Sequence, residues 1–84
     1  MDSAPEQLQV HDLVRVASVA DRVSWVAGDD TVARPPRVAD EGRVVASDAG
    51  GLRVVVEMCH PSGHKIWQAT FASADLQLIW RASR

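Results

Sequence analysis

The residues between Met58 and Trp67 hold most of the side chains in this sequence that could do chemistry. The segment reads MCHPSGHKIW and contains the only cysteine, two of the three histidines and one of the three tryptophans. A closed zinc site needs four ligands, usually from two spaced pairs. Here Cys59 and His60 are adjacent, so in a strand they point to opposite faces, and His11 would have to supply a further imidazole. The spacing favours a turn, and we expect no metal site.

Cys59 is also the only residue that could act as a thiol nucleophile. A reactive thiol needs an electropositive, partly exposed setting and a base within reach. Strand geometry directs His60 away from it, and the sequence shows no third group that would orient a base. We therefore expect Cys59 to be a small buried apolar residue, with His60 and His64 on either side of a solvated turn. The sequence favours a non-catalytic protein with no cofactor, without deciding the question.

Three tryptophans carry nearly all the aromatic surface, because the chain has no tyrosine and one phenylalanine. Alternation along residues 65–71 predicts Trp67 in the core. Trp25 precedes residues 26–40, a segment longer than most connections in compact domains. Tryptophan and arginine dominate binding hot spots, so Trp25, Arg34 and Arg37 are candidate contact residues. Trp25 packed as a lid over one end of the core is the alternative.

Charge argues against nucleic acid as the partner. The 84 residues carry a formal net charge of -2, and the charges of residues 26–40 are mixed. Single-stranded nucleic acid binds to clustered basic residues beside aromatic platforms. Only Arg15, Arg43 and Arg53, expected on one face of the sheet, could provide the basic part, and such residues more often form a solvated face.

The sequence also bears on location. No apolar run approaches the length of a membrane span. The acidic and polar residues 1–7 lack the basic and apolar parts of a secretory signal. With a single unpaired cysteine as well, these features predict a cytoplasmic protein with no membrane partner.

The apolar pattern predicts an all-β chain. Val14 and Val16 alternate with Arg15, and this period of two recurs along the sequence. Residues 72–76 predict a single helical turn, with Leu76 and Ile79 as apolar anchors at its exit. A further short extended piece is possible at residues 22–26. The expected strands lie at residues 10–19, 41–47, 52–58, 65–71 and 77–80.

This order of elements resembles SH3-like barrels. The strand DLVRV leads into a long loop, EGRVV begins the second main strand with a glycine, LRVVVEM and KIWQATF follow, and ASADLQLI supplies the helical turn. The resemblance implies a five-stranded barrel, with the helical turn before the last strand. The expected organisation is a flexible arm at residues 1–9, the barrel at 10–81 and a tail at 82–84.

A narrower part of the chain is similar to the plasmid-borne type II dihydrofolate reductases, which are SH3-like barrels that assemble as tetramers around a shared pore. The similar residues are His60, Pro61, Ser62, Ile66, Trp67, Ala74, Leu76 and Ile79. A Gln-Ile-Tyr triplet lines the pore in that family, where this chain has Lys65, Ile66 and Trp67. The changed side chains do not carry the enzymatic activity over. The resemblance implies only a small barrel that forms a multimer.

Two functions remain open from the sequence. The first is a non-catalytic module that binds another protein or itself, because a core of this size gains stability from association. The second is a homo-oligomeric small-molecule-binding protein or enzyme, with a pocket shared at the interface between subunits. The residues expected to line that pocket are His60, His64, Lys65, Ile66 and Trp67.

Overall fold

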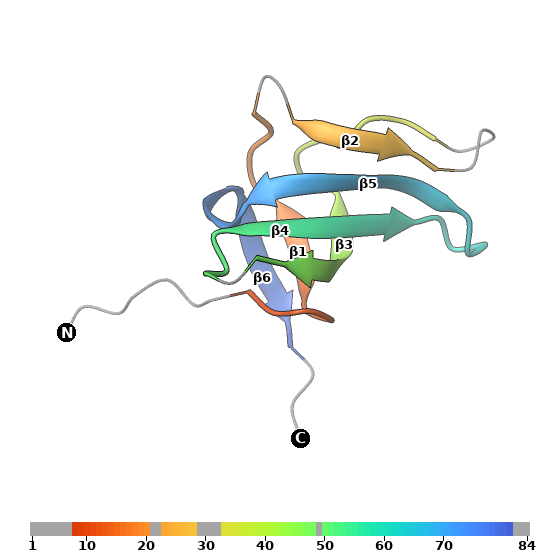
Figure 1. Ribbon diagram of the computed structural model, residues 1–84. Helices are drawn as coiled ribbons and strands as arrows, with labels where there is room; N and C mark the ends of the chain where they lie inside the picture. Colours follow the sequence, from red (N-terminus) through yellow and green to blue (C-terminus); the bar gives the residue numbers. More distant parts are fainter. Residues whose placement is uncertain (1–7, 21–22, 29–32, 49, 82–84) are drawn as a thin grey trace.

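Six β-strands and one turn of 3-10 helix form the computed structural model, which describes residues 8–20, 23–28, 33–48 and 50–81. The elements are β1 (Leu13–Val16), β2 (Ser24–Ala27), β3 (Glu41–Ser47), β4 (Arg53–Cys59), β5 (Lys65–Ala72), η1 (Ser73–Asp75) and β6 (Leu76–Trp80). All strand pairs are antiparallel, in the order β2-β5-β4-β3-β1-β6 (Figure 1). The all-β class and the helical turn before the last strand are confirmed.

The prediction of five strands in a closed barrel differs from what is found, an open sheet of six. The short extended piece expected near residues 22–26 is β2, which pairs with β5 along its whole length. It occupies the edge of β5 through which a five-stranded barrel would have closed onto β6. Within the described ranges no pairing joins β2 to β6, so these two strands are the edges of the sheet.

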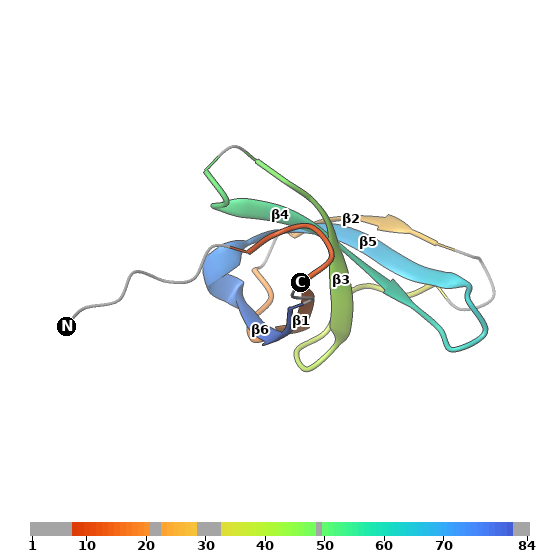
Figure 2. The ribbon, with the colours of Figure 1, turned by 90° about the horizontal axis from the view of Figure 1, so that it is seen from below.

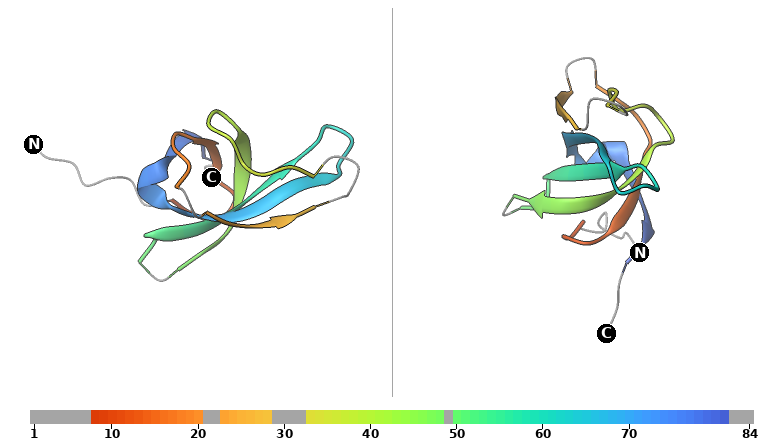
Figure 3. Two further views of the ribbon diagram at one scale, coloured as in Figure 1. Left: turned by 90° about the horizontal axis from the view of Figure 1, so that it is seen from above. Right: turned by 90° about the vertical axis from the view of Figure 1, so that its right-hand side faces the viewer.

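The sheet bends at β3. In Figure 1 β4 and β5 run across the picture, while β1 and β6 run down behind them. The view from below in Figure 2 shows β3 carrying the sheet from one direction to the other, and Figure 3 shows the bend from above and from the side. The register between β3 and β4 shifts between Val44 and Ala46, which leaves Val45 as an extra residue. Such β-bulges increase the local twist, which helps the sheet to enclose a core.

The core lies on the enclosed face of this bend. Val14 and Val16 are buried while Arg15 is exposed, as the alternation predicted. Trp67 is fully buried, at 0% exposed, and its ring meets that of Phe71 edge-on with centroids 5.8 Å apart. Ile66, expected on the opposite face from Trp67, is buried as well. The buried apolar residues are Leu8, Val14, Val16, Val44, Val54, Val56, Ile66, Trp67, Ala69 and Phe71.

A buried ion pair ties the end of β6 to the residue before β1. Asp12 is 2% exposed, and Arg81 donates from Nε to Oδ1 at 2.9 Å and from Nη2 to Oδ2 at 2.7 Å. The backbone N–H of Gln9 also donates to Oδ2, at 2.8 Å. The hydrogen bonds from Arg81 lower the pKa of Asp12 despite its burial. The pair therefore holds the carboxylate charged and fixes β6 against β1.

Candidate functional site

Two of the predicted binding residues, Arg34 and Trp67, meet at Asp40. Arg34 donates from Nη1 to Oδ2 at 2.7 Å and from Nη2 to Oδ1 at 2.9 Å. The indole Nε1 of Trp67 donates to Oδ2 at 3.0 Å, and the backbone N–H of Arg37 does so at 2.9 Å. The side chain of Asp40 is only 10% exposed. The four residues form one connected cluster, which we name the Asp40 cluster.

The Asp40 cluster is an anchor for the loop that precedes β3. Burial alone would raise the pKa of Asp40, but the hydrogen bonds from Arg34, the Arg37 N–H and Trp67 outweigh it and hold the pKa below its ordinary value of 3.8. Asp40 in turn raises the pKa of Arg34. The cluster therefore fixes the loop over Trp67, and its carboxylate is a weaker base than an ordinary aspartate.

The other candidates of this region remain on the surface. Trp25 is 37% exposed on the edge strand β2, opposite Ala69. Arg37 is exposed, and its guanidinium has no hydrogen bond or ion pair among the residues that the structure describes. The structure thus separates Arg34, which is held by Asp40, from Trp25 and Arg37.

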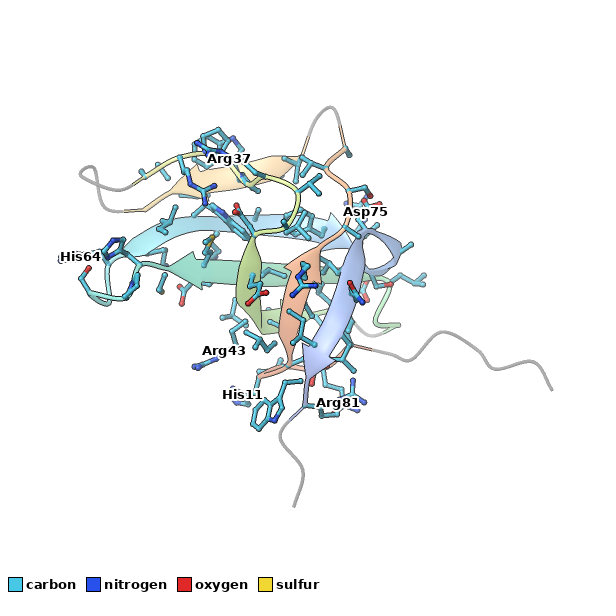
Figure 4. All side chains as sticks on the ribbon, turned by 180° about the vertical axis from the view of Figure 1, so that it is seen from behind. His11, Arg37, Arg43, His64, Asp75 and Arg81 are labelled. Atoms are coloured by element: carbon cyan, nitrogen blue, oxygen red, sulfur yellow. The ribbon has the colours of Figure 1, made fainter. Side chains whose placement is uncertain are left out.

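The turn predicted between His60 and His64 is confirmed. The backbone N–H of His60 donates to the carbonyl of His64 at 2.8 Å, and that of Gly63 donates to the carbonyl of His60 at 2.7 Å. Gly63 has a φ of 96°, which favours glycine. The Nδ1 of His60 lies 2.9 Å from Ser62 Oγ. Both histidines are exposed, and Figure 4 shows His64 at the tip of the β4–β5 hairpin, far from Arg37.

Cys59 is exposed, so the prediction of a buried cysteine is wrong. The register between β4 and β5 shifts between Met58 and Cys59, at the end of the strand and beyond the core. Lys65, its cross-strand neighbour, forms an ion pair with Glu57 at 2.8 Å and donates to Gln68 at 3.1 Å. The hydrogen bond to Glu57 raises the pKa of Lys65.

The proposed shared pocket is only partly presented at the surface. His60, His64 and Lys65 are accessible, whereas Ile66 and Trp67 belong to the core. Across the described ranges no three side chains among histidine, cysteine, aspartate and glutamate are placed to hold a metal ion. That part of the chain also contains no helix long and apolar enough to cross a membrane.

A hollow that the sequence did not predict lies on the outer face of β1, β3 and β6. This hollow, which we name the Trp80 hollow, has a volume of about 290 Å³ and is lined by His11, Leu13, Arg43 and Trp80. Leu13 pairs with Trp80 on one side and with Arg43 on the other, so the three residues form a row across the strands. The row faces away from the core, because Leu13 alternates with buried Val14.

The members of the Trp80 hollow come from different parts of the chain. Trp80 is the most exposed tryptophan, at 58%. His11 has a φ of 81°, and its N–H donates to the carbonyl of Val44 at 2.8 Å, which fixes it beside β3. Figure 4 shows His11 and Arg43 near each other at the end of the molecule opposite Arg37.

A β-bulge turns Trp80 outward. Simple alternation would place it on the same face as Leu76 and Leu78, which pack against the core. Instead Val14 pairs with Leu78 and Leu13 pairs with Trp80, so Ile79 is an extra residue in β6. Ile79 is therefore 39% exposed, and Leu78, rather than the predicted Ile79, is the second apolar anchor after η1. In the sequence this strand end is only a run of three apolar residues, Leu-Ile-Trp, and such a run does not show where a bulge lies.

Arg43 is an uncompensated cation. Arg15, Arg34, Lys65 and Arg81 each form an ion pair with a carboxylate. The guanidinium of Arg43 has no such partner and no hydrogen bond within the described ranges. A second hollow of about 250 Å³ shares Leu13 and Arg43 and extends to Glu41, Gly42, Glu57 and Cys59. The surface thus offers an indole, an aliphatic side chain and one free positive charge, which is suited to binding.

No protein-family model, curated protein or solved structure matches this chain.

Proposed function

We propose that this protein is a non-catalytic interaction module that binds a partner protein through the Trp80 hollow. The observation that carries the proposal is the exposed indole of Trp80 in one row with Leu13 and the unpaired guanidinium of Arg43. Binding hot spots are enriched in tryptophan and arginine, and they lie where an aromatic anchor can be fully desolvated by the partner. A solvent-exposed indole gains most from such burial.

The fold and the thiol support two further parts of this proposal. The bent antiparallel sheet with a 3-10 turn before its last strand fits an SH3-like architecture to which β2 adds an edge strand. The exposed and unpaired Cys59 favours a reducing compartment such as the cytoplasm, where thiols persist.

Panning a random peptide library against the immobilised protein tests the proposal. We expect enriched peptides to bind the wild type and the Trp25→Ala variant, and to lose about tenfold or more in affinity for Trp80→Ala. Peptides that depend on Trp25 and not on Trp80 would move the interaction surface to β2. The absence of any enriched peptide that depends on a tryptophan would refute peptide recognition by this sheet.

Self-assembly is the second candidate, and the edge strand β2 is the observation that favours it. Its sequence, SWVA, has no charge and no proline, which are the usual protections of a sheet edge. Val26 in this strand is largely exposed. Light scattering over a dilution series distinguishes the candidates, because an edge-paired dimer doubles the mass and dissociates on Val26→Lys. A mass of one chain at all concentrations would exclude self-assembly.

A further inference from the structure

The Trp80 hollow also indicates the chemistry of the partner, and this inference rests on the proposed function. We propose that it binds an extended peptide segment in which an apolar residue is followed, two positions later, by an aspartate or glutamate. The apolar side chain packs between Trp80 and Leu13, and the carboxylate pairs with Arg43.

The charged residues around the hollow determine which charge the partner must carry. Glu41 accepts from Arg15 at 2.8 Å, and Glu57 accepts from Lys65 at 2.8 Å, so these four charges compensate one another. Arg43 pairs in register with Glu57, whose charge Lys65 already neutralises. Arg43 is left as the single free cation in the row, and a planar guanidinium binds a carboxylate with two parallel hydrogen bonds. The partner therefore supplies one carboxylate.

The spacing follows from the strand row. Neighbouring strands lie about 4.8 Å apart, so the midpoint between Trp80 and Leu13 is about 7 Å from Arg43 along the row. Residues i and i+2 of an extended peptide lie on the same side of its backbone and about 6.6–6.8 Å apart. A peptide that crosses β6, β1 and β3 can thus place an apolar side chain between Trp80 and Leu13 and an acidic one at Arg43.

A nucleic-acid strand fits this surface less well. Repeated phosphates are bound by several basic residues, and affinity grows with the number of phosphates neutralised. Here Glu41 and Glu57 line the hollow that continues beyond Arg43, and the cations Arg15 and Lys65 are already paired with them. A backbone of phosphates would meet two carboxylates immediately after its first contact.

Titration of the labelled protein with synthetic nine-residue peptides, followed by NMR, tests the inference. The peptides carry Leu-Ser-Glu, Leu-Ser-Gln or Leu-Ser-Lys at the centre of an otherwise uncharged, capped sequence. We expect the Glu peptide to shift the Trp80 indole signal and to bind about fivefold or more tightly than the Gln peptide. Arg43→Ala removes this difference, whereas Arg53→Ala, the same change elsewhere on the sheet, retains it. Arg43→Glu reverses the preference toward the Lys peptide.

Three outcomes would overturn the inference. Equal affinities for the Glu and Gln peptides, both dependent on Trp80, would show that the hollow does not select an acidic residue. The proposed interaction function would then still hold. An oligothymidylate that shifts the same signals, while no peptide does, would make the ligand a nucleic acid. If no peptide of the set shifts Trp80 although the random library yields peptides dependent on Trp80, the recognised pattern differs from the one inferred. Failure of that library as well would refute the proposed function itself.

Discussion

Carboxylates at two positions hold the surface loops of this protein in place. Asp12 and Asp40 are both mostly buried, and each receives two hydrogen bonds from an arginine and one from a backbone N–H. Glu41, by contrast, pairs with Arg15 where both side chains are nearly half exposed. Ion pairs at the surface contribute little to stability, whereas removing one partner of a buried pair leaves an uncompensated charge.

The substitution Asp40→Asn tests the importance of this arrangement. Asparagine keeps the shape but loses the charge, so Arg34 remains partly buried without a counter-ion. We expect the free energy of unfolding to fall by about 1–3 kcal/mol, measured by urea denaturation. The Nε1 of Trp67 also loses a charged acceptor, which adds to the cost.

Glu41→Gln is the matched control, because it makes the same chemical change at an exposed pair. The expected cost is below about 1 kcal/mol. A loss for Asp40→Asn no larger than this would mean that the Asp40 cluster is not what holds the loop.

At the scale of the elements, alternation predicts most of the sheet. Val14 and Val16 in β1, and Trp67 and Phe71 in β5, are buried as a period of two requires. The sequence does not locate register shifts, because a bulge depends on how two strands pair. The exposure of Trp80 and of Cys59, which both lie at strand ends beside such a shift, therefore does not follow from the sequence pattern.

The edge of the sheet was also beyond the sequence pattern. The segment 24–27 is short and exposed, so its sequence does not predict which strand it pairs with. Their pairing with β5 adds the sixth strand. Of the predicted binding residues, Arg34 and Trp67 both donate hydrogen bonds to Asp40. Trp67 lies 27 positions from Asp40 in the chain, and no local pattern predicts this contact.

Close packing between β3 and β4 gives a second prediction, for Gly42→Ala. A Cβ at Gly42 would lie 2.7 Å from both the carbonyl oxygen of Glu57 and Cγ1 of Val56. The backbone would have to shift, and we expect a loss of about 1–3 kcal/mol in the free energy of unfolding. Gly50→Ala serves as the control in the same denaturation experiment, because its nearest atom is 3.8 Å away. Equal stability of the two variants would contradict the close approach of β3 and β4 at Gly42.

The whole molecule should respond to acid through the same two carboxylates. The pKa values of Asp12 and Asp40 are both held below their ordinary value of 3.8. A folded-state pKa lower than the unfolded one gives stability that is fully present above the unfolded value. That stability is lost as the pH falls through the folded value.

As far as these two groups determine it, we therefore expect the melting temperature to be nearly independent of pH above about pH 5 and to fall steeply below about pH 4. Circular dichroism melts from pH 6 to pH 2 measure this. Asp40→Asn should melt lower than the wild type at pH 6, and the gap should narrow as the pH falls toward 2. A gap that stays constant over this range would show that the ionisation of Asp40 does not stabilise the fold.

The pairing of Asp12 with Arg81 has a consequence for how the protein is made. The two residues are 69 positions apart, and β1 needs β6 as a pairing neighbour. At a synthesis rate of about 5–20 residues per second, β1 precedes Arg81 by roughly 3–14 s. Throughout that interval Val14 and Val16 lack the strand that covers them on one side. We expect the growing chain to be open to chaperone binding until this strand has emerged.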